Sequence, residues 1–161
     1  MELRYVEVDY HDPAQARALV ELLENYALDP MGGGEPLPEQ VSANLPAALA
    51  KRADALSLLC YADGEPCGLI NCFEGFSTFK CQPLMNIHDV VVKREYRGLG
   101  ISRGLLAKVE DIARARGCCK LTLEVLEGNE VAQAAYRRFG FAGYELDPAL
   151  GRAIFWEKVL S

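Results

Sequence analysis

The sequence predicts a single α/β (α+β) domain that spans residues 1–161. A chain of 161 residues is long enough for one domain with its own hydrophobic core. Half of the residues are hydrophobic and a quarter are charged, as in ordinary globular proteins. Apolar runs typical of strands alternate with runs at helical spacing, and no repeat, low-complexity tract or linker interrupts them. The expected order is one strand, two helices, three strands, a helix, a strand, a helix and two final strands.

The first third of the chain is expected to contain one strand and two helices. Asp12-Pro13 is a typical helix start, because Asp caps a helix and Pro is favoured at the first helical position. A loop rich in Gly and Pro follows over 29–38. Pro46 interrupts the second helix and weakens its pattern. The expected elements are a strand over 3–9 and helices over 13–27 and 38–51.

The remainder of the chain is expected to contain six strands and two helices. Asp63-Gly64-Glu65-Pro66 joins two apolar runs and indicates a hairpin. Apolar side chains at helical spacing follow Gly100, and Gly117 ends that helix. The expected strands cover 55–61, 67–76, 84–92, 121–126, 141–146 and 153–159, and the helices cover 101–117 and 131–138.

The charge of the chain restricts its partners. A net charge of −6 disfavours nucleic acid, since Lys and Arg supply most of the affinity for phosphate backbones. No apolar run approaches the ~18 residues of a membrane span, and the N-terminus lacks the apolar core of an export signal. We therefore expect a cytoplasmic protein with no membrane partner. Its cysteines should be reduced, with Cys60, Cys67 and Cys72 in the core.

A glycine-containing turn between a strand and a helix is the strongest functional signal. Gly98 and Gly100 permit positive φ angles, and the N–H groups of the new helix attract anions. Five basic side chains and one acidic side chain lie from Lys93 to Lys108, a local charge of +4 in a chain whose remainder carries −10. This pattern predicts a phosphate-bearing ligand, the alternative being a solvated basic helix start. A dinucleotide fingerprint ending at Gly104 is disfavoured, because Gly104 falls inside the expected helix.

Two motifs resemble the GNAT superfamily of N-acetyltransferases. The run Arg97-Gly98-Leu99-Gly100-Ile101-Ser102 resembles the acetyl-CoA pyrophosphate loop of that family, although Ser102 stands where the family has Gly or Ala. Asn129, Ala132, Tyr136 and Gly140-Phe141 resemble its second signature. The resemblance covers essentially the whole chain. It implies a mixed, mostly antiparallel, twisted sheet of about seven strands flanked by about four helices.

The resemblance also implies how acetyl-CoA would be bound as co-substrate, with no metal and no covalent enzyme intermediate. The strand before the glycine turn would splay from its neighbour and pair with the pantetheine through backbone groups, and the turn would wrap the pyrophosphate. Asn129 would reach the cofactor or would serve only as a helix cap. The residues implied in cofactor binding are Val90, Val91, Val92, Arg97, Gly98, Leu99, Gly100, Ile101, Ser102, Arg103, Asn129, Ala132 and Tyr136.

Tyr136 and Glu124 are the candidate catalytic residues. The resemblance places Tyr136 near the cofactor sulfur, where a phenol can protonate the leaving thiolate; the alternative is a core aromatic. Glu124 stands in an otherwise apolar strand, where partial burial would raise its pKa and suit a general base. The alternative is a carboxylate paired with Arg or Lys. His88, Asp89, Glu74 and a chain of waters are further candidates for the base.

The acceptor is predicted only as a class. The loop at Gly32-Gly33-Gly34 is flanked by acids and would favour a cationic amine, unless it is merely solvated. The expected partner is therefore a small-molecule amine or a peptide amine. A homodimer is an open alternative, because an apolar edge strand over Ala153 to Trp156 would invite pairing. A non-catalytic acyl-CoA sensor on the same fold is the alternative to an acetyltransferase.

Overall fold

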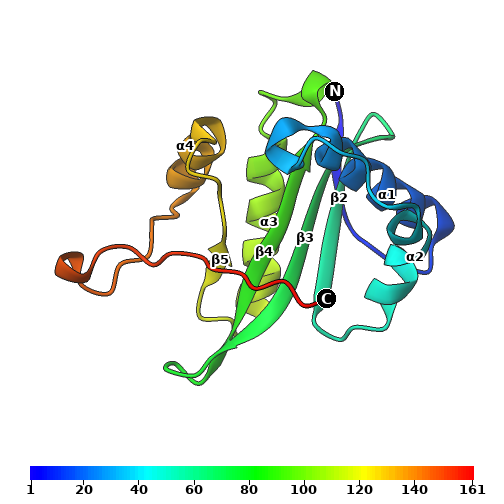
Figure 1. Ribbon diagram of the computed structural model, residues 1–161. Coiled ribbons are helices and arrows are strands. Elements are labelled where there is room, and N and C mark those ends of the chain that lie inside the picture. Colours follow the sequence, from blue (N-terminus) through cyan, green and yellow to red (C-terminus); the bar gives the residue numbers. More distant parts are fainter. The chain divides into compact units, whose positions relative to one another are not determined.

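The computed structural model describes residues 1–161 as two compact units, Met1–Glu127 and Gly128–Ser161 (Figure 1). The first unit contains β1 (Leu3–Glu7), α1 (Pro13–Leu28), η1 (Pro30–Gly32), α2 (Glu39–Ala50), β2 (Ala55–Ala62), β3 (Glu65–Ser77), β4 (Gln82–Val92), η2 (Arg94–Tyr96), α3 (Ile101–Ala115) and β5 (Leu121–Leu123). The second contains α4 (Glu130–Phe139) and η3 (Pro148–Leu150). The expected α/β fold class, with a mixed sheet and four helices, is confirmed.

The first unit is built on one sheet with the strand order β1-β2-β3-β4-β5. Neighbouring strands are antiparallel except β4 and β5, which are parallel. The hairpin predicted at Asp63-Gly64 is confirmed, with φ of 48° at Asp63 and 84° at Gly64. The β3–β4 ladder shifts register between Asn71 and Cys72, which leaves His88 as the extra, bulged residue of β4.

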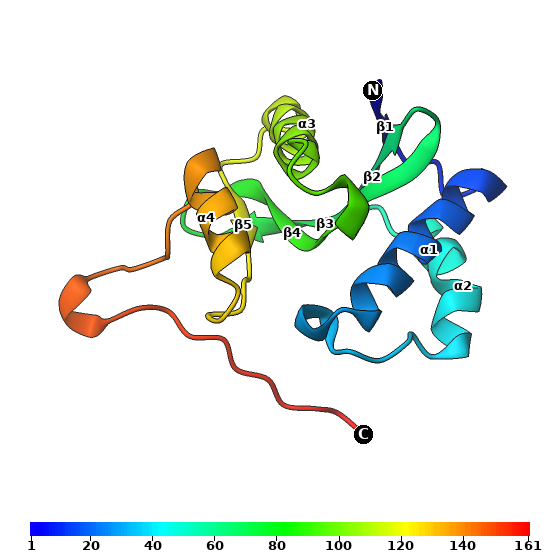
Figure 2. The same ribbon diagram turned by 90° about the horizontal axis from the view of Figure 1, so that it is seen from above.

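Helices cover both faces of this sheet. Figure 2 shows α1 and α2 on one face and α3 on the other. Alternation along the strands explains the division, since Leu59 and Leu69 pack with α1 whereas Gly68 lies under α3. A Cβ at Gly68 would lie 2.8 Å from Cγ2 of Ile101, so this glycine permits the close approach of α3 to the sheet.

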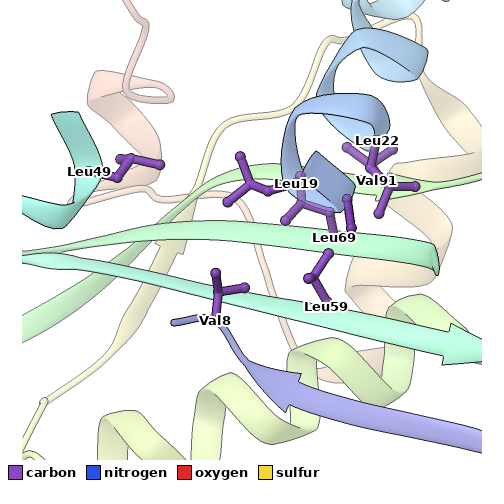
Figure 3. Packing of buried hydrophobic residues seen from close by; sticks show 8 residues of the cluster. Val8, Leu19, Leu22, Leu49, Leu59, Leu69 and Val91 are labelled. Carbon is purple, nitrogen blue, oxygen red and sulfur yellow. The ribbon is translucent and has the colours of Figure 1, made fainter. Parts of the chain in front are cut away.

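The core between α1 and the sheet is apolar (Figure 3). The Asp12 side chain accepts hydrogen bonds from Ala14 N and Gln15 N, so that α1 begins where the sequence predicts. Its buried face contributes to a cluster made of Val8, Ala18, Leu19, Leu22, Leu49, Leu59, Leu69 and Val91. The expected burial of Cys60, Cys67 and Cys72 is confirmed. Burial raises the pKa of the Cys67 and Cys72 thiols to about 12.

The second unit is organised around α4. The Asn129 side chain accepts a hydrogen bond from Ala132 N at 3.2 Å and caps the helix. Gly140, with φ of 116°, ends it and donates its N–H to the carbonyls of Tyr136 and Arg137. None of the helices in the whole chain combines the length and the apolar character needed to span a membrane.

The expected strand count is wrong, because the structure has five strands where about seven were expected. The segments 141–146 and 153–159 carry no strand ladder, although Ala153 N donates to Tyr144 O at 3.3 Å. Apart from the partly buried Phe141, their large apolar side chains are exposed, to 72% at Phe155 and 80% at Trp156. Alternation predicts a face to be buried, but a strand forms only when a partner strand supplies hydrogen bonds. The edge strand behind the homodimer alternative is therefore absent, and dimerisation stays a prediction.

Candidate active site

The glycine turn joins β4 to α3 as the sequence predicts. Gly98 and Gly100 have φ of 82° and 79°, in the left-handed region that favours glycine. A Cβ at either position would meet nothing within 4 Å, so the turn is open to a ligand. Gly100 is the N-cap of α3 and makes no side-chain cap hydrogen bond, so the first N–H groups of α3 face this opening uncapped by a side chain. Uncapped N–H groups at a glycine turn suit a phosphate.

The strand before the turn separates from its neighbour. β5 pairs with β4 only from Met85↔Leu121 to Ile87↔Leu123, whereas β4 continues to Val92. The stretch Val90–Val92 is therefore paired with β3 on one side and has no strand partner on the other. Val92 O accepts a hydrogen bond from Arg97 Nε, and the other outward N–H and C=O groups of this stretch are arranged to receive an amide-bearing ligand.

Two ion pairs tie the basic turn to α1 and η1. Arg97 Nη2 lies 3.6 Å from Asp29 Oδ2, and Arg97 Nε donates to Val92 O at 3.3 Å. Lys93 Nζ lies 3.0 Å from Glu21 Oε1. The Arg97 side chain is more than half exposed. An anion at the turn would meet a guanidinium that is already oriented, and would compete with Asp29 for it.

Two residues at the start of α3, Ile101 and Gly104, have structural roles. Ile101 is buried, so only its backbone is available to a ligand. Gly104 lies inside α3, where a Cβ would lie 1.9 Å from Tyr5 Oη. Gly104 is thus a glycine because α3 packs closely on β1. This contact accounts for the third glycine of the disfavoured dinucleotide pattern.

A chain of polar side chains crosses the α1 face of the sheet. Tyr10 Oη lies 2.8 Å from Ser57 Oγ, Ser57 Oγ donates to Asn71 Oδ1 at 2.6 Å, and Asn71 Nδ2 donates to Asp89 Oδ2 at 3.1 Å. Ser57 and Asn71 are buried, with 2% and 4% of their surface exposed. From the sequence, Asp89 is expected only as an alternative base, and Tyr10, Ser57 and Asn71 are not expected to belong to the site. The available signal was two polar residues, Ser57 and Asn71, inside otherwise apolar strands.

The candidate bases differ in their surroundings. Glu124 lies just beyond β5 and is exposed, so the burial expected for it is not found. It follows Leu123, the last residue paired with β4, and so lies where the two strands part. Glu74 lies 3.9 Å from Arg116, as a structural carboxylate would. His88 is exposed and meets the ring of Phe73 edge-on at 5.5 Å.

The remaining predicted residues belong to the second unit. Asn129 and Ala132 form the N-terminal cap of α4. Tyr136 lies on the same helix, and its ring meets Phe141 at 5.9 Å. The structure therefore brings Asn129, Ala132 and Tyr136 together on one helix. Their meeting with the glycine turn, Val90–Val92 and Glu124 of the first unit stays a prediction.

A separate groove of about 950 Å³ lies between α1 and α2. It is lined partly by Tyr10, Arg17, Glu21, Glu24 and Lys51. None of the residues predicted to bind cofactor or to act in catalysis lines it. The groove is thus distinct from the turn at which the predicted cofactor residues gather.

Known proteins match the chain in sequence and in fold. The sequence matches the family model for the Acetyltransferase (GNAT) family over residues 19–141. Streptothricin acetyltransferase of Streptomyces lavendulae is 42% identical over 89 residues, which are 55% of this chain and 45% of the relative. Thialysine N-epsilon-acetyltransferase of Bos taurus is 37% identical over 86 residues, 49% of each chain. The chain therefore spans about half the length of these curated relatives.

A solved aminoglycoside N-acetyltransferase in complex with CoA has the same fold. It superimposes with a TM-score of 0.76 at 17% identity, over 98% of this chain and 95% of the other. The family match covers most of the chain and includes the glycine turn, the separation of β4 from β5, and α4. From this match and the geometry of the turn, we conclude that the chain belongs to the acetyltransferase (GNAT) family.

Proposed function

We propose that this protein transfers an acetyl group from acetyl-CoA to a primary amine by direct attack in a ternary complex. The observation that carries the proposal is the open glycine turn, which combines positive φ at Gly98 and Gly100 with an α3 N-terminus that has no side-chain cap. A solved relative by fold binds CoA, which supports the choice of co-substrate. Acetyl-CoA would supply the activated thioester carbonyl.

Different segments of the chain would bind different parts of acetyl-CoA. The turn from Arg97 to Arg103 would hold the pyrophosphate through its N–H groups, with the Arg97 guanidinium as a further donor. The unpaired edge of Val90–Val92 would pair with the amides of the pantetheine arm. Asn129, Ala132 and Tyr136 would complete the site from α4. These assignments are supported by the family match and by the separation of β4 from β5 after Ile87.

Acetyl transfer needs a neutral amine and a proton for the departing thiolate. Tyr136 would donate its phenolic proton to the sulfur as the C–S bond breaks, while the amine nitrogen forms the new bond to the carbonyl carbon. Glu124 would remove the proton from the amine. Its place where β4 and β5 part supports this role, and its exposed side chain is accessible to an incoming amine.

The proposed acceptor is a cationic small-molecule amine or a peptide amine. The names of the relatives support this class, since streptothricin, thialysine and aminoglycosides are amines. The acidic balance of the chain outside the turn also favours a cation. Neither nucleic acid nor a membrane is a proposed partner, and a cytoplasmic location stays a prediction of the sequence.

Release of CoA thiol tests the proposal directly. The protein is incubated with acetyl-CoA and a panel of putrescine, lysine, an aminoglycoside and a peptide with an unblocked N-terminus. Amine-dependent thiol release is expected, together with an acetylated amine detected by mass spectrometry. A protein that binds acetyl-CoA but releases no thiol with any amine would instead be the acyl-CoA sensor.

A further inference from the structure

The polar chain from Tyr10 to Asp89 has one hydrogen-bond direction. The single hydroxyl proton of Ser57 is donated to Asn71 Oδ1, so Ser57 Oγ can only accept from the Tyr10 hydroxyl. The carboxylate of Asp89 accepts from Asn71 Nδ2, which settles which end of the Asn71 amide faces it. Each donor therefore points toward Asp89. Such a chain holds the carboxylate in one orientation.

Asp89 lies where the proposed function places the reactive end of the co-substrate. The glycine turn follows Val92, and the pantetheine would run back along β4 past Val91 and Val90, so the thioester would reach the level of Asp89. Asp89 pairs with Asn71 in the β3–β4 register, directly after the bulged His88. Leu123, the last β5 residue paired with β4, faces Ile87 just before the bulge.

The Asp89 carboxylate is accessible and lacks a permanent cation among its ion-pair contacts. Its side chain is 22% exposed, and the ion pair it makes is with His88 Nδ1 at 3.8 Å, a group charged only when protonated. Tyr26 lies on α1. Burial raises the pKa of its phenol, and the charges of the nearby carboxylates of Asp89 and Asp29 raise it further. The groups around Asp89 thus comprise an amide, an imidazole, a neutral phenol and a second acid, Asp29, whose charge is already paired with Arg97 at 3.6 Å. A cation is the ligand that these surroundings favour.

We propose that Asp89 binds the ammonium group of the acceptor, and that Asn71, Ser57 and Tyr10 are positioning residues that hold its carboxylate in place. The inference rests on the proposed function, and it specifies the acceptor as an amine that is positively charged when it binds. Burying the polar side chains of Ser57 and Asn71 is costly unless each is hydrogen-bonded, and apolar residues at these two strand positions would serve the fold alone. The expected benefit of this burial is orientation of a carboxylate at the point where transfer occurs.

Kinetics of single variants test the inference. Asp89→Asn should raise the KM of the best amine of the panel roughly tenfold to a hundredfold, the range for losing a hydrogen bond to a charged group. Tyr10→Phe, Ser57→Ala and Asn71→Leu each interrupt the hydrogen-bonded chain. Each should raise the amine KM, and the rise should be larger the nearer the changed residue lies to Asp89. The KM of acetyl-CoA should stay unchanged in all four variants. Asp111→Asn, the same change at an exposed position of α3, is the matched control.

A binding measurement separates this inference from the proposed function. In calorimetry with CoA present, putrescine should bind the wild-type protein. It should bind Asp89→Asn roughly tenfold to a hundredfold more weakly, the factor expected for the KM. Its neutral diol analogue should bind both proteins equally weakly. Asp89-dependent binding without thiol release would refute the proposed function and support the inference. Failure of every cationic amine to bind, or an unchanged amine KM and affinity in Asp89→Asn, would overturn the inference.

The variants of Tyr10, Ser57 and Asn71 decide between positioning and mere folding. Circular dichroism and thermal melts identify any variant that fails to fold, and Tyr10→Phe, which removes one hydroxyl from a partly exposed residue, keeps the test usable in that case. A positioning role raises the amine KM while leaving the KM of acetyl-CoA unchanged. A loss of melting temperature with both KM values unchanged, or with both raised equally, would show that the hydrogen-bonded chain is only structural.

Discussion

Replacement of Gly104 by alanine tests how closely α3 approaches β1. The new Cβ would lie 1.9 Å from Tyr5 Oη and 2.3 Å from Tyr5 Cζ, far inside normal contact distance. The Tyr5 ring is rigid and belongs to a strand paired with β2. Either the phenol must leave its place or α3 must move away from the sheet. Both responses disturb the core on the α3 face.

The expected cost follows from two opposing effects. Alanine is favoured over glycine inside a helix by about 1 kcal/mol. Overpacking of a close contact costs about 1–3 kcal/mol, and the overlap with two ring atoms favours the upper end. The net loss of unfolding free energy is therefore about 2 kcal/mol. For a chain of this length it corresponds to a fall in Tm of roughly 4 to 8 °C.

Urea and thermal unfolding, followed by circular dichroism, measure this effect. In a Tyr5→Leu background the clash is gone, so Gly104→Ala should be neutral or stabilising, and the double-mutant cycle should show coupling between the two positions. A Gly104→Ala protein with an unchanged or higher Tm in the wild-type background would refute the reasoning. An equal loss of Tm in both backgrounds would refute it as well.

Three further outcomes follow from the site and the core. Tyr136→Phe should lower kcat by roughly a hundredfold or more while the KM of acetyl-CoA changes little; an unchanged kcat in thiol-release assays would exclude Tyr136 as the acid. Glu124→Gln should lower kcat by roughly a hundredfold while the KM of acetyl-CoA changes little, and an unchanged kcat would exclude Glu124 as the base. The thiols of Cys67 and Cys72 have folded pKa values of about 12, above the ordinary 9.0, so the unfolded state loses protons first and stability falls as pH rises from 9.0 toward 12. Urea midpoints across that range should fall less steeply in a Cys67→Ala/Cys72→Ala protein, and equal slopes would contradict the assignment.

The glycine turn could be predicted because its chemistry is local. Gly98 and Gly100 stand between a β-branched strand and an amphipathic helix, and a positive φ at each is a property of a few consecutive residues. Helix starts at Asp12 and Asn129 were predictable for the same reason, since a cap bonds N–H groups two or three residues away.

The polar chain could not be predicted, because its members are distant in the sequence. Tyr10 and Ser57 are 47 residues apart, and Asn71 and Asp89 are 18 apart. They meet only because the register of β2, β3 and β4 aligns Ser57, Asn71 and Asp89. The extra residue His88 in β4 shifts the register of its pairing with β3 by one residue and so sets Asp89 opposite Asn71. A shift of one residue in either ladder would send these side chains to opposite faces of the sheet.

The sequence by itself determined the fold class, the order of the elements up to α4, the glycine turn and the family, because each depends on spacing along the chain. Only the tertiary structure decided where β4 and β5 part, that Glu124 is exposed, and that Ser57 and Asn71 orient Asp89. It also decided that 141–146 and 153–159 form no strands. Strand pairing, burial and register depend on which distant segment supplies the partner, and local periodicity does not carry that information.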